Sequence, residues 1–289
     1  MLVIVNPAAG RVRSSRLRLG RTIAGVRRRG CSVVVQSAGS TAGDTERLAR
    51  EVEPGIDIVV AAGGDGTINA VANGLALAPR EVPLAVLPFG TANVLAREIG
   101  LPRDPESLAE MIASGAVSAI WPGRVGDRLF LTCASSGFDA EIVASVRPWL
   151  KRHFGRLAFA WAMGVGVVRY RARELVVRCD GGEYRAAAVV AAKSRYYAGS
   201  WVVAPQASLA EPGLDLVLLG RSGRLAILRY LLALPFGRLP RRDDVTPLRC
   251  RSAGLSAAEP LPVQADGEIV GFLPVTLGVA ERPLYLVRP

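Results

Sequence analysis

The sequence predicts two domains, a parallel α/β domain followed by an antiparallel domain of the β-sandwich kind. The chain has 289 residues, which is enough for two domains that each bury a hydrophobic core. Over the first 120 residues, short apolar runs alternate with helical patterns and glycine-rich turns, as in a parallel sheet whose strands are joined by helices. From about Trp121 onward, short segments of alternating polarity follow one another, which is typical of antiparallel strands.

The first domain is predicted to contain four buried strands. Each is a short run of apolar or β-branched residues, and the runs are Leu2–Val5, Cys31–Gln36, Ile56–Ala61 and Leu84–Leu87. The arginine-rich segment Ser14–Arg29 and the segment Ala42–Glu53 have helical spacing and lie between these runs. Helices between successive strands predict that the strands are parallel.

The second domain is predicted to be rich in antiparallel strands, with one or two helices. Its strand-like segments are Arg128–Cys133, Leu175–Cys179, Ala186–Ala192, Leu214–Leu219, Val275–Leu277 and Leu284–Val287. Pro102, Pro105 and the turn Trp121-Pro122-Gly123 bracket the expected boundary between the domains.

Composition excludes several classes of protein. The four cysteines form no C-x-x-C pair and His153 is the only histidine, which argues against Ser-His-Asp catalysis and against a histidine-rich metal site. No secretion signal is visible and no apolar run reaches the length of a membrane span, so we expect a soluble or peripheral protein in a reducing compartment.

The net charge of +11 is concentrated in the second half of the chain. Residues 1–120 carry 13 cationic and 11 acidic residues, whereas residues 121–289 carry 23 and 14. This asymmetry favours an anionic surface as partner of the second half. A solvated basic face, or an arginine-rich genome, would explain the same charge.

Three loops at strand ends carry the strongest functional signal. Gly63–Asn69 follows the third predicted strand and opens a helix, Asn6–Gly10 follows the first strand, and Pro88–Asn93 follows the fourth. Glycines let the backbone approach an anion, and the N–H groups at a helix N-terminus attract phosphate. In a parallel sheet the three loops share one edge, so they predict a phosphate site that is neither a dinucleotide fingerprint nor a P-loop.

These residues resemble the diacylglycerol kinase catalytic-domain family, in particular its soluble bacterial lipid kinases, and are similar to sphingosine and ceramide kinase domains. The resemblance rests on the motifs Asn6-Pro7-x-x-Gly10, Gly63-Gly64-Asp65-Gly66-Thr67, Leu87-Pro88-Phe89-Gly90-Thr91-Ala92-Asn93, Ser136-Gly137-Phe138-Asp139, Phe154-Gly155-Arg156-Leu157-Ala158-Phe159 and Asp266-Gly267-Glu268. Their order and spacing cover nearly the whole chain.

The resemblance implies an ATP-dependent lipid kinase with Mg²⁺, built as an α/β ATP-binding domain over 1–120 and a β-rich lipid-substrate domain over 121–278. It implies a cleft between the two, with the chain end, about 279–289, returning to the first domain. A role in phospholipid biosynthesis, a cytoplasmic location and peripheral attachment to an anionic membrane would follow. Whether the chain forms a homodimer is left open.

Carried over at matched positions, the resemblance also implies site residues. The ATP contacts would be Asn6, Pro7, Ala8, Ala9, Gly10, Thr41, Gly63, Gly64, Asp65, Gly66, Thr67, Ile68, Asn69, Thr91 and Asn93. Glu268 would be the base that takes the proton from the lipid hydroxyl, and Asp266 a supporting charge. Magnesium would be bound by Asp65 or by an acidic residue of the second domain. Taken alone, Asp266-Gly267-Glu268 predicts only a hairpin turn, and Thr41 equally predicts a helix cap.

Two positions depart from the family pattern. Val94 stands where many members have an aspartate after the Gly-Thr-x-Asn motif. Bacterial members tend to hold a structural magnesium at an Asp-Asp-Gly loop, and here the segment is Ala210-Glu211-Pro212-Gly213, which leaves only Glu211 and backbone carbonyls as metal ligands.

Two other functions compete with a lipid kinase. A kinase for a soluble acceptor such as NAD or a sugar would use the same glycine-rich turn. Against this, the apolar and basic segment from Trp149 to Trp161 favours a membrane interface, although core packing would explain an apolar helix too. A nucleic-acid-binding module would fit the charge, but no helix-turn-helix, zinc-finger or RRM signature is visible, so we expect no nucleic-acid partner.

Overall fold

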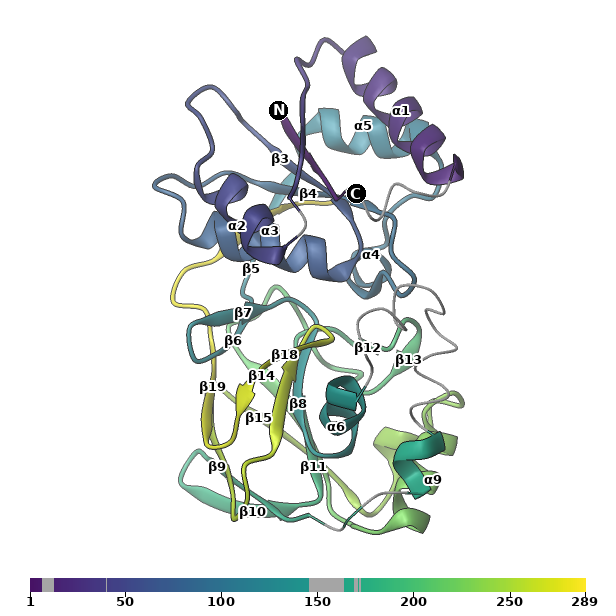
Figure 1. Ribbon diagram of the computed structural model, residues 1–289, viewed down its shortest axis with the longest axis vertical. Coiled ribbons are helices and arrows are strands. Elements are labelled where there is room, and N and C mark those ends of the chain that lie inside the picture. The colour runs from purple at the N-terminus through teal and green to yellow at the C-terminus, as the bar shows by residue number, and fades with distance from the viewer. Residues whose placement is uncertain (7–12, 40, 146–163, 169–170, 172) are drawn as a thin grey trace. The chain divides into compact units, whose positions relative to one another are not determined.

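The computed structural model describes residues 1–6, 13–39, 41–145, 164–168, 171 and 173–289. It contains two compact units, one formed by Met1–Trp121 with Arg282–Pro289 and the other by Pro122–Glu281 (Figure 1). Among the described residues, no helix is long and apolar enough to cross a membrane.

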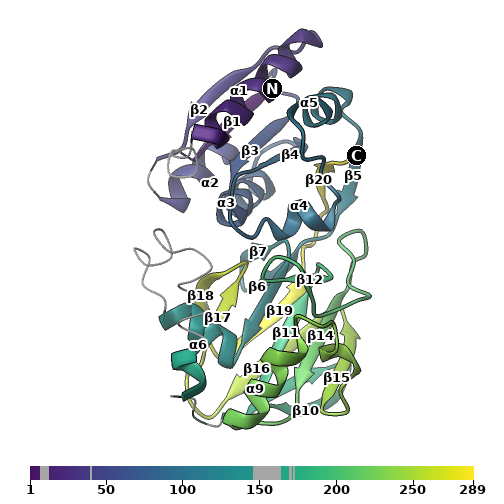
Figure 2. The same ribbon diagram turned by 90° about the vertical axis from the view of Figure 1, so that its right-hand side faces the viewer.

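The first unit is built on a six-stranded sheet. Its strands run in the order β2, β1, β3, β4, β20, β5 and are β1 (Leu2–Val5), β2 (Val34–Ser37), β3 (Val59–Gly63), β4 (Leu84–Pro88), β5 (Val117–Ile120) and β20 (Leu284–Val287). The pairs from β2 to β20 are parallel, and only β5 is antiparallel to its neighbour β20. The last strand of the chain therefore completes the sheet of the first unit, as Figure 2 shows in yellow beside β4.

Five helices of the described residues pack around this sheet. They are α1 (Arg13–Arg28), α2 (Ala42–Arg50), α3 (Asp65–Ala76), α4 (Val94–Glu98) and α5 (Pro105–Ser114). Helix α1 packs with α5, and α2 packs with α3. The core under α1 and α5 joins Val26 and Leu108 to strand residues such as Val60 and Leu87, because the central strands β3 and β4 are apolar and buried on both faces.

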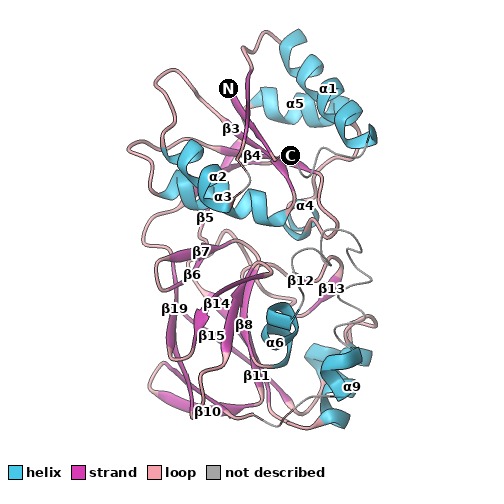
Figure 3. Cartoon of the chain, in the orientation of Figure 1, coloured by secondary structure: helices cyan, strands magenta, loops and turns pink. Residues whose placement is uncertain are grey.

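The second unit is an antiparallel β-sandwich (Figure 3). One sheet has the order β10, β9, β16, β19, β6, β7, with β6 (Gly123–Val125), β7 (Arg128–Phe130), β9 (Leu175–Cys179), β10 (Gly182–Ala186), β16 (Ser252–Ala257) and β19 (Val275–Val279). The other has the order β15, β14, β11, β8, β17, β18, with β8 (Cys133–Ser136), β11 (Ala188–Ala192), β14 (Leu214–Leu219), β15 (Val245–Cys250), β17 (Pro262–Ala265) and β18 (Glu268–Phe272). A short ribbon pairs β12 (Tyr196–Tyr197) with β13 (Trp201–Val202).

Two hydrophobic cores stabilise this unit. The main core lies between the sheets, where Val177 and Leu255 of one sheet pack with Val189 and Val263 of the other. A second core lies under helix α9 (Arg224–Ala233), near the 3₁₀ helix η2 (Leu239–Arg241) and helix α6 (Phe138–Ser145). The parallel α/β and antiparallel sandwich classes predicted from the sequence are both confirmed.

Several elements differ in detail from their predicted bounds. The second strand begins at Val34 rather than Cys31, because residues 31–33 lie outside the ladder with β1. The apolar run Arg128–Cys133 is divided between β7 and β8, which belong to different sheets. Periodicity could not separate the two strands, since both are buried and they lie only two residues apart.

Candidate functional site

The glycine turn after β3 leads directly into helix α3. Gly64 is the N-cap of α3, so no side chain caps the first turn of this twelve-residue helix. Its peptide N–H groups supply the positive end of the helix dipole at the carboxyl edge of the sheet. An uncapped helix start at this edge is suited to an anionic group such as a phosphate.

The turn after β4 lies against the turn after β3. A Cβ atom on Gly90 would lie 2.6 Å from the Cα of Gly64 and 2.8 Å from Oδ1 of Asn93, which is closer than real Cβ contacts. The Phe89 N–H also donates to the Gly63 carbonyl at 2.8 Å. Glycine is needed at position 90 because the two backbones touch there.

Asp65 and Asn93 tie these two turns together. The Oδ1 atom of Asp65 accepts the N–H of Val94 at 2.9 Å, which caps the start of α4 from the neighbouring loop. Asn93 has a left-handed backbone, with φ of 47°, and its side chain both accepts from the Gly90 N–H and donates to the Gly90 carbonyl, each at 2.8 Å. The structure thus gives both residues a role in holding the loops, and Val94 contributes to this contact through its backbone N–H rather than its side chain.

The first predicted loop reaches the same place through Asn6. Its Nδ2 atom donates to Oγ1 of Thr67 at 3.0 Å, and its backbone N–H donates to the Ala62 carbonyl at 3.1 Å. Asn69 is buried and accepts hydrogen bonds from the Nδ2 atom of Asn73 at its carbonyl and at Oδ1. Asn6, Thr67 and the glycine turn are therefore adjacent, as the predicted meeting of loops at one edge requires.

The structure describes four of the remaining predicted nucleotide contacts of the first unit. Thr41 caps helix α2 in a reciprocal capping box with Asp44, and Thr91 is exposed after β4. Gly66 and Ile68 belong to the first turn of α3, where Ile68 is buried. Pro7, Ala8, Ala9 and Gly10 lie outside the described residues, as do His153 and the segment from Trp149 to Trp161.

In the second unit, Asp266 accepts hydrogen bonds from three successive residues where β7 leads into β8. Its Oδ2 atom accepts the Leu131 N–H at 2.7 Å, and its Oδ1 atom accepts the N–H groups of Thr132 and Cys133 at 2.9 and 3.2 Å, together with the Thr132 hydroxyl. In return, the Asp266 N–H donates to the Cys133 carbonyl at 2.9 Å. Its carboxylate therefore fixes the β17–β18 hairpin to the start of β8.

Glu268 emerges from this anchored hairpin. It is the first residue of β18, pairs with Ala265 across the hairpin, and is exposed. The turn before it is fixed further by the Gly267 N–H, which donates to Oε1 of Gln264 at 2.8 Å. Glu268 is thus an exposed carboxylate on a rigid support, whereas Asp266 serves as the support.

A buried polar network continues from Gln264 to Asp139. The Nε2 atom of Gln264 donates to Oγ of Ser135 at 2.6 Å, and Oδ2 of Asp139 accepts the hydroxyls of Ser135 and Tyr197 at 2.6 and 2.9 Å. Burial raises the pKa of the Asp139 carboxyl, and the hydrogen bonds partly oppose this. The sequence supplied Asp139 only as part of a motif, because its partners come from β8, β12 and β17.

The loop predicted to hold a structural magnesium does not fit a metal ion. The Nζ atom of Lys193 donates to the carbonyls of Glu211 and Gly213 at 2.6 and 2.8 Å, and the Glu211 carboxylate forms an ion pair with Arg249. Lys193 is fully buried, and burial lowers the pKa of its ammonium to about 8, while Asp215 opposes the shift. An ammonium thus occupies the carbonyl oxygens that a cation at this loop would need, and we propose no metal-ligand role for Glu211.

The sequence contained a signal for this lysine that the predictions did not use. Only two of the 36 cationic residues are lysines, and Lys193 directly follows the buried strand Ala188–Ala192. A lone lysine after such a strand must find oxygen partners inside the fold. Which oxygens these are depends on the distant loop 210–213.

Comparison with known proteins places the chain in a family. Residues 1–125 match the family model described as the diacylglycerol kinase catalytic domain, and residues 132–288 match the YegS C-terminal NAD kinase beta sandwich-like domain. A diacylglycerol kinase of Bacillus subtilis (strain 168) is 30% identical over 259 residues, which cover 87% of this chain and 84% of the relative. The chain belongs to the diacylglycerol kinase family. This confirms the predicted ATP-dependent lipid kinase, a phosphotransferase that uses an alcohol as acceptor.

Other members of the diacylglycerol kinase family are similar over most of their length. A diacylglycerol kinase of Mycobacterium tuberculosis (strain ATCC 25618 / H37Rv) is 29% identical over 295 residues, covering 99% of this chain and 94% of the relative. The structure of a diacylglycerol kinase from Bacillus anthracis str. Sterne has a TM-score of 0.76 at 19% identity and covers all of this chain and 96% of that chain. A second solved structure from the same organism has a TM-score of 0.83 at 21% identity, covering all of this chain and 94% of that chain, so the fold extends over both units.

Proposed function

We propose that this diacylglycerol kinase family member transfers the γ-phosphoryl group of ATP to the hydroxyl of a diacylglycerol-like lipid. In this proposal the first unit binds ATP and the second unit, within residues 121–278, binds the lipid and supplies the base. The observation that carries the proposal is the contact of the Gly64 and Gly90 turns at the uncapped start of α3. Side chains at these positions would push the two turns apart and displace the N–H groups at the start of α3.

ATP binding would use the backbone more than side chains. The N–H groups of Gly64 to Thr67 point along the helix start, and Asn6 and Thr67 are already joined by a hydrogen bond beside them. A phosphate held by peptide N–H groups and a helix dipole needs no lysine, which agrees with a turn that has none. The exposed Thr91 would add a hydroxyl to this binding region, and the family resemblance adds Pro7 to Gly10, which lie outside the described residues.

Magnesium would be held mainly by the phosphates of ATP. Within the described part of the chain, no group of three or more histidine, cysteine, aspartate or glutamate residues could hold a metal ion. Mg²⁺ commonly uses one or two carboxylates together with substrate phosphates, and Asp65 in the glycine turn is placed to supply one. Bound there, the ion would neutralise charge on the transferring phosphoryl group.

The proton of the acceptor hydroxyl would go to Glu268. An alcohol is far less acidic than a carboxylic acid, so the proton should leave as the oxygen attacks phosphorus rather than before the attack. A base for this step must be open to substrate and held in a fixed position. Glu268 is exposed, and the hydrogen bonds of Asp266 and Gln264 hold its hairpin on both sides.

The decisive experiment is transfer of radiolabelled phosphate from ATP to a panel of acceptors in mixed micelles. The panel contains diacylglycerol, phosphatidylglycerol, a sphingoid base, ceramide and, as the soluble alternative, NAD. We expect a lipid hydroxyl to be labelled and Glu268→Gln to lose at least about 100-fold in turnover while keeping its affinity for ATP. The matched control is Glu183→Gln, which changes an exposed glutamate of another hairpin and should leave turnover unchanged.

Two results would contradict this assignment. Labelling of NAD alone would show a soluble acceptor in spite of the family, and it is worth testing because the second unit matches an NAD kinase-like sandwich. Equal turnover of Glu268→Gln and wild type would remove Glu268 as the base. Within the proposal, the protein works in the cytoplasm at the membrane surface where its lipid lies.

A further inference from the structure

Helix α9 of the second unit is apolar on two opposite sides. On one side Ile227 and Tyr230 are buried in the second core, where they pack with residues of β11 and β14. On the other side Leu225, Leu228 and Leu232 follow one another at a spacing of three and four residues, which places them on one face. These leucines are 60%, 43% and 59% exposed.

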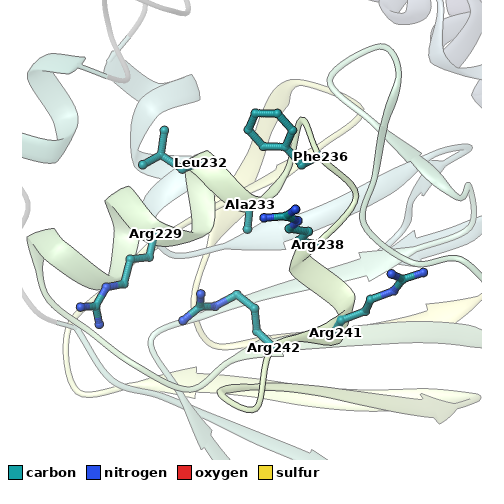
Figure 4. A pocket seen from close by; sticks show the side chains of 7 residues that line it. All are labelled: Arg229, Leu232, Ala233, Phe236, Arg238, Arg241 and Arg242. Carbon is teal, nitrogen blue, oxygen red and sulfur yellow. The ribbon is translucent and has the colours of Figure 1, made fainter.

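The exposed face continues beyond the end of the helix. Phe236, in the turn after α9, is 73% exposed. Figure 4 shows Phe236 and Leu232 projecting on the same side of the chain. A surface helix normally turns polar residues to water, so a row of exposed leucines that ends in a phenylalanine indicates a surface that binds something apolar.

The same segment is strongly cationic. Residues 221–242 contain six arginines and no aspartate or glutamate. Arg229, Arg238, Arg241 and Arg242 line a hollow of about 580 Å³ together with Leu232, Ala233 and Phe236 (Figure 4). The apolar row and the cationic hollow therefore share one surface.

The arginines of this hollow are not equivalent. Arg242 is held by Asp244, with Nε 2.8 Å from Oδ1, and its guanidinium lies 5.4 Å from the centre of the Tyr230 ring. Arg229, Arg238 and Arg241 have no carboxylate within 4 Å among the residues that the structure describes. Arg242 is thus part of the fold, and the other three present unneutralised charge beside the apolar row.

We propose that this surface, named the α9 surface and formed by Leu225, Leu228, Leu232, Phe236, Arg229, Arg238 and Arg241, docks on an anionic phospholipid bilayer. The leucines and the phenylalanine would enter the boundary between headgroups and acyl chains, and the arginines would contact lipid phosphates. The inference rests on the proposed function in that a lipid kinase must reach a bilayer. It differs from the sequence prediction, which placed the membrane contact between Trp149 and Trp161.

The positive charge of the α9 surface favours an anionic bilayer over a second copy of the chain as its partner. A twofold interface would bring the same surface of two copies together, with Arg229, Arg238 and Arg241 of one facing those of the other. An anionic headgroup layer instead offers negative charge to every arginine while the apolar row enters the lipid. One partner of this chemistry therefore explains both features of the α9 surface.

The test is co-sedimentation of the full chain with vesicles of phosphatidylcholine alone and of phosphatidylcholine with phosphatidylglycerol in equal parts. We expect binding to the anionic vesicles that falls as salt rises. Leu232→Glu/Phe236→Glu and Arg238→Glu/Arg241→Glu should each lower this binding at least about 10-fold. All four side chains lie at the surface, so circular dichroism and melting should stay as in the wild type.

Matched controls separate this surface from general hydrophobicity and charge. Leu17→Glu/Leu77→Glu changes two leucines of the first unit that are 55% and 58% exposed, and Arg50→Glu/Arg103→Glu reverses two exposed arginines there. Both control variants should bind vesicles as the wild type does. If they lose as much binding as the α9 variants, attraction is not local to α9 and the inference is overturned.

A short-chain diacylglycerol such as dihexanoylglycerol, dispersed below its micellar concentration, separates docking from catalysis. The α9 variants should phosphorylate this substrate at the wild-type rate and lose activity only on long-chain diacylglycerol in anionic vesicles. If the wild type phosphorylates neither substrate, the proposed function fails, and vesicle binding still decides the inference. If the α9 variants bind vesicles like the wild type, and light scattering shows that they break a dimer, the surface joins two copies and the inference is wrong.

Discussion

Replacing Asp266 with asparagine tests whether this residue supports the fold or the reaction. The carboxylate accepts four hydrogen bonds from Leu131, Thr132 and Cys133, whose side chains are at most 7% exposed. An asparagine oxygen can replace Oδ1 and keep the bonds to Thr132 and Cys133. Its NH₂ group then faces the Leu131 N–H, so that two donors meet where a 2.7 Å hydrogen bond was.

The expected loss of stability follows from this geometry. A buried N–H left without an acceptor costs about 1–3 kcal/mol, and hydrogen bonds to a neutral oxygen have about half the strength of those to a carboxylate. Because Asp266 itself is only half-buried, part of this loss is screened by water, and we expect a decrease of about 3 kcal/mol in the free energy of unfolding. For a unit of this size that corresponds to a melting temperature lower by roughly 6–12 °C.

The assay combines urea unfolding with hydrogen exchange, read at the amides of residues 131–133. A matched control is available in Asp180→Asn, since Asp180-Gly181 forms a hairpin turn with φ of 48° and 78°, close to the 47° and 84° of Asp266-Gly267. Asparagine tolerates this left-handed backbone, so the control should stay within about 0.5 kcal/mol of the wild type. Wild-type stability and amide protection in Asp266→Asn, combined with a large loss of turnover, would refute the structural role. Asp266 would then act in the phosphoryl-transfer reaction itself.

Two further predictions concern the glycine turn and the buried lysine. Gly90→Ala should abolish ATP binding in calorimetry while the chain stays folded, because its Cβ would push the Gly64 turn away; an unchanged affinity would show that the turns can separate without harm. Lys193→Met should lower the free energy of unfolding at pH 7 by about 3 kcal/mol, since it leaves the carbonyls of Glu211 and Gly213 and the carboxylate of Asp215 without their cation, and EDTA should not alter the wild-type melting temperature. Because the folded-state pKa of Lys193 is about 8, below the ordinary 10.5, the unfolded chain holds more protons between these values, so the stability difference between wild type and variant should grow as pH rises through this window. A difference that stays flat or shrinks over that range would contradict the lowered pKa.

Local patterns determined the elements of the first unit because a buried parallel strand leaves a continuous apolar signature. The runs that became β1, β3 and β4 were recognisable from a few residues, and the glycines after β3 marked the turn into α3. Pairing of the final strand was different. Leu284–Val287 resembles any alternating strand. The family resemblance implied that the chain end returns to the first domain, and only the fold shows that this strand pairs with both β4 and β5.

The candidate site shows the same division. The residue types at the glycine turn predicted an anion site, since backbone N–H groups and a helix start are local properties. The roles of individual carboxylates could not be predicted from their neighbours in the sequence. Asp65 caps a helix that begins at Val94, and Asp266 binds residues 131–133, so both partners are distant in sequence.

By itself the sequence therefore determined the two fold classes, the glycine-rich turn that opens α3 and the excess of positive charge after residue 120, because each depends on composition or on neighbours along the chain. Tertiary structure alone decided that Lys193 fills the loop at Glu211, that Asp266 supports Glu268, and that α9 leaves an apolar face uncovered beside three arginines. The physical reason is that the hydrogen bonds of a buried charge and the exposure of an apolar side chain are set by the segments packed against them. Those segments can lie anywhere in the chain.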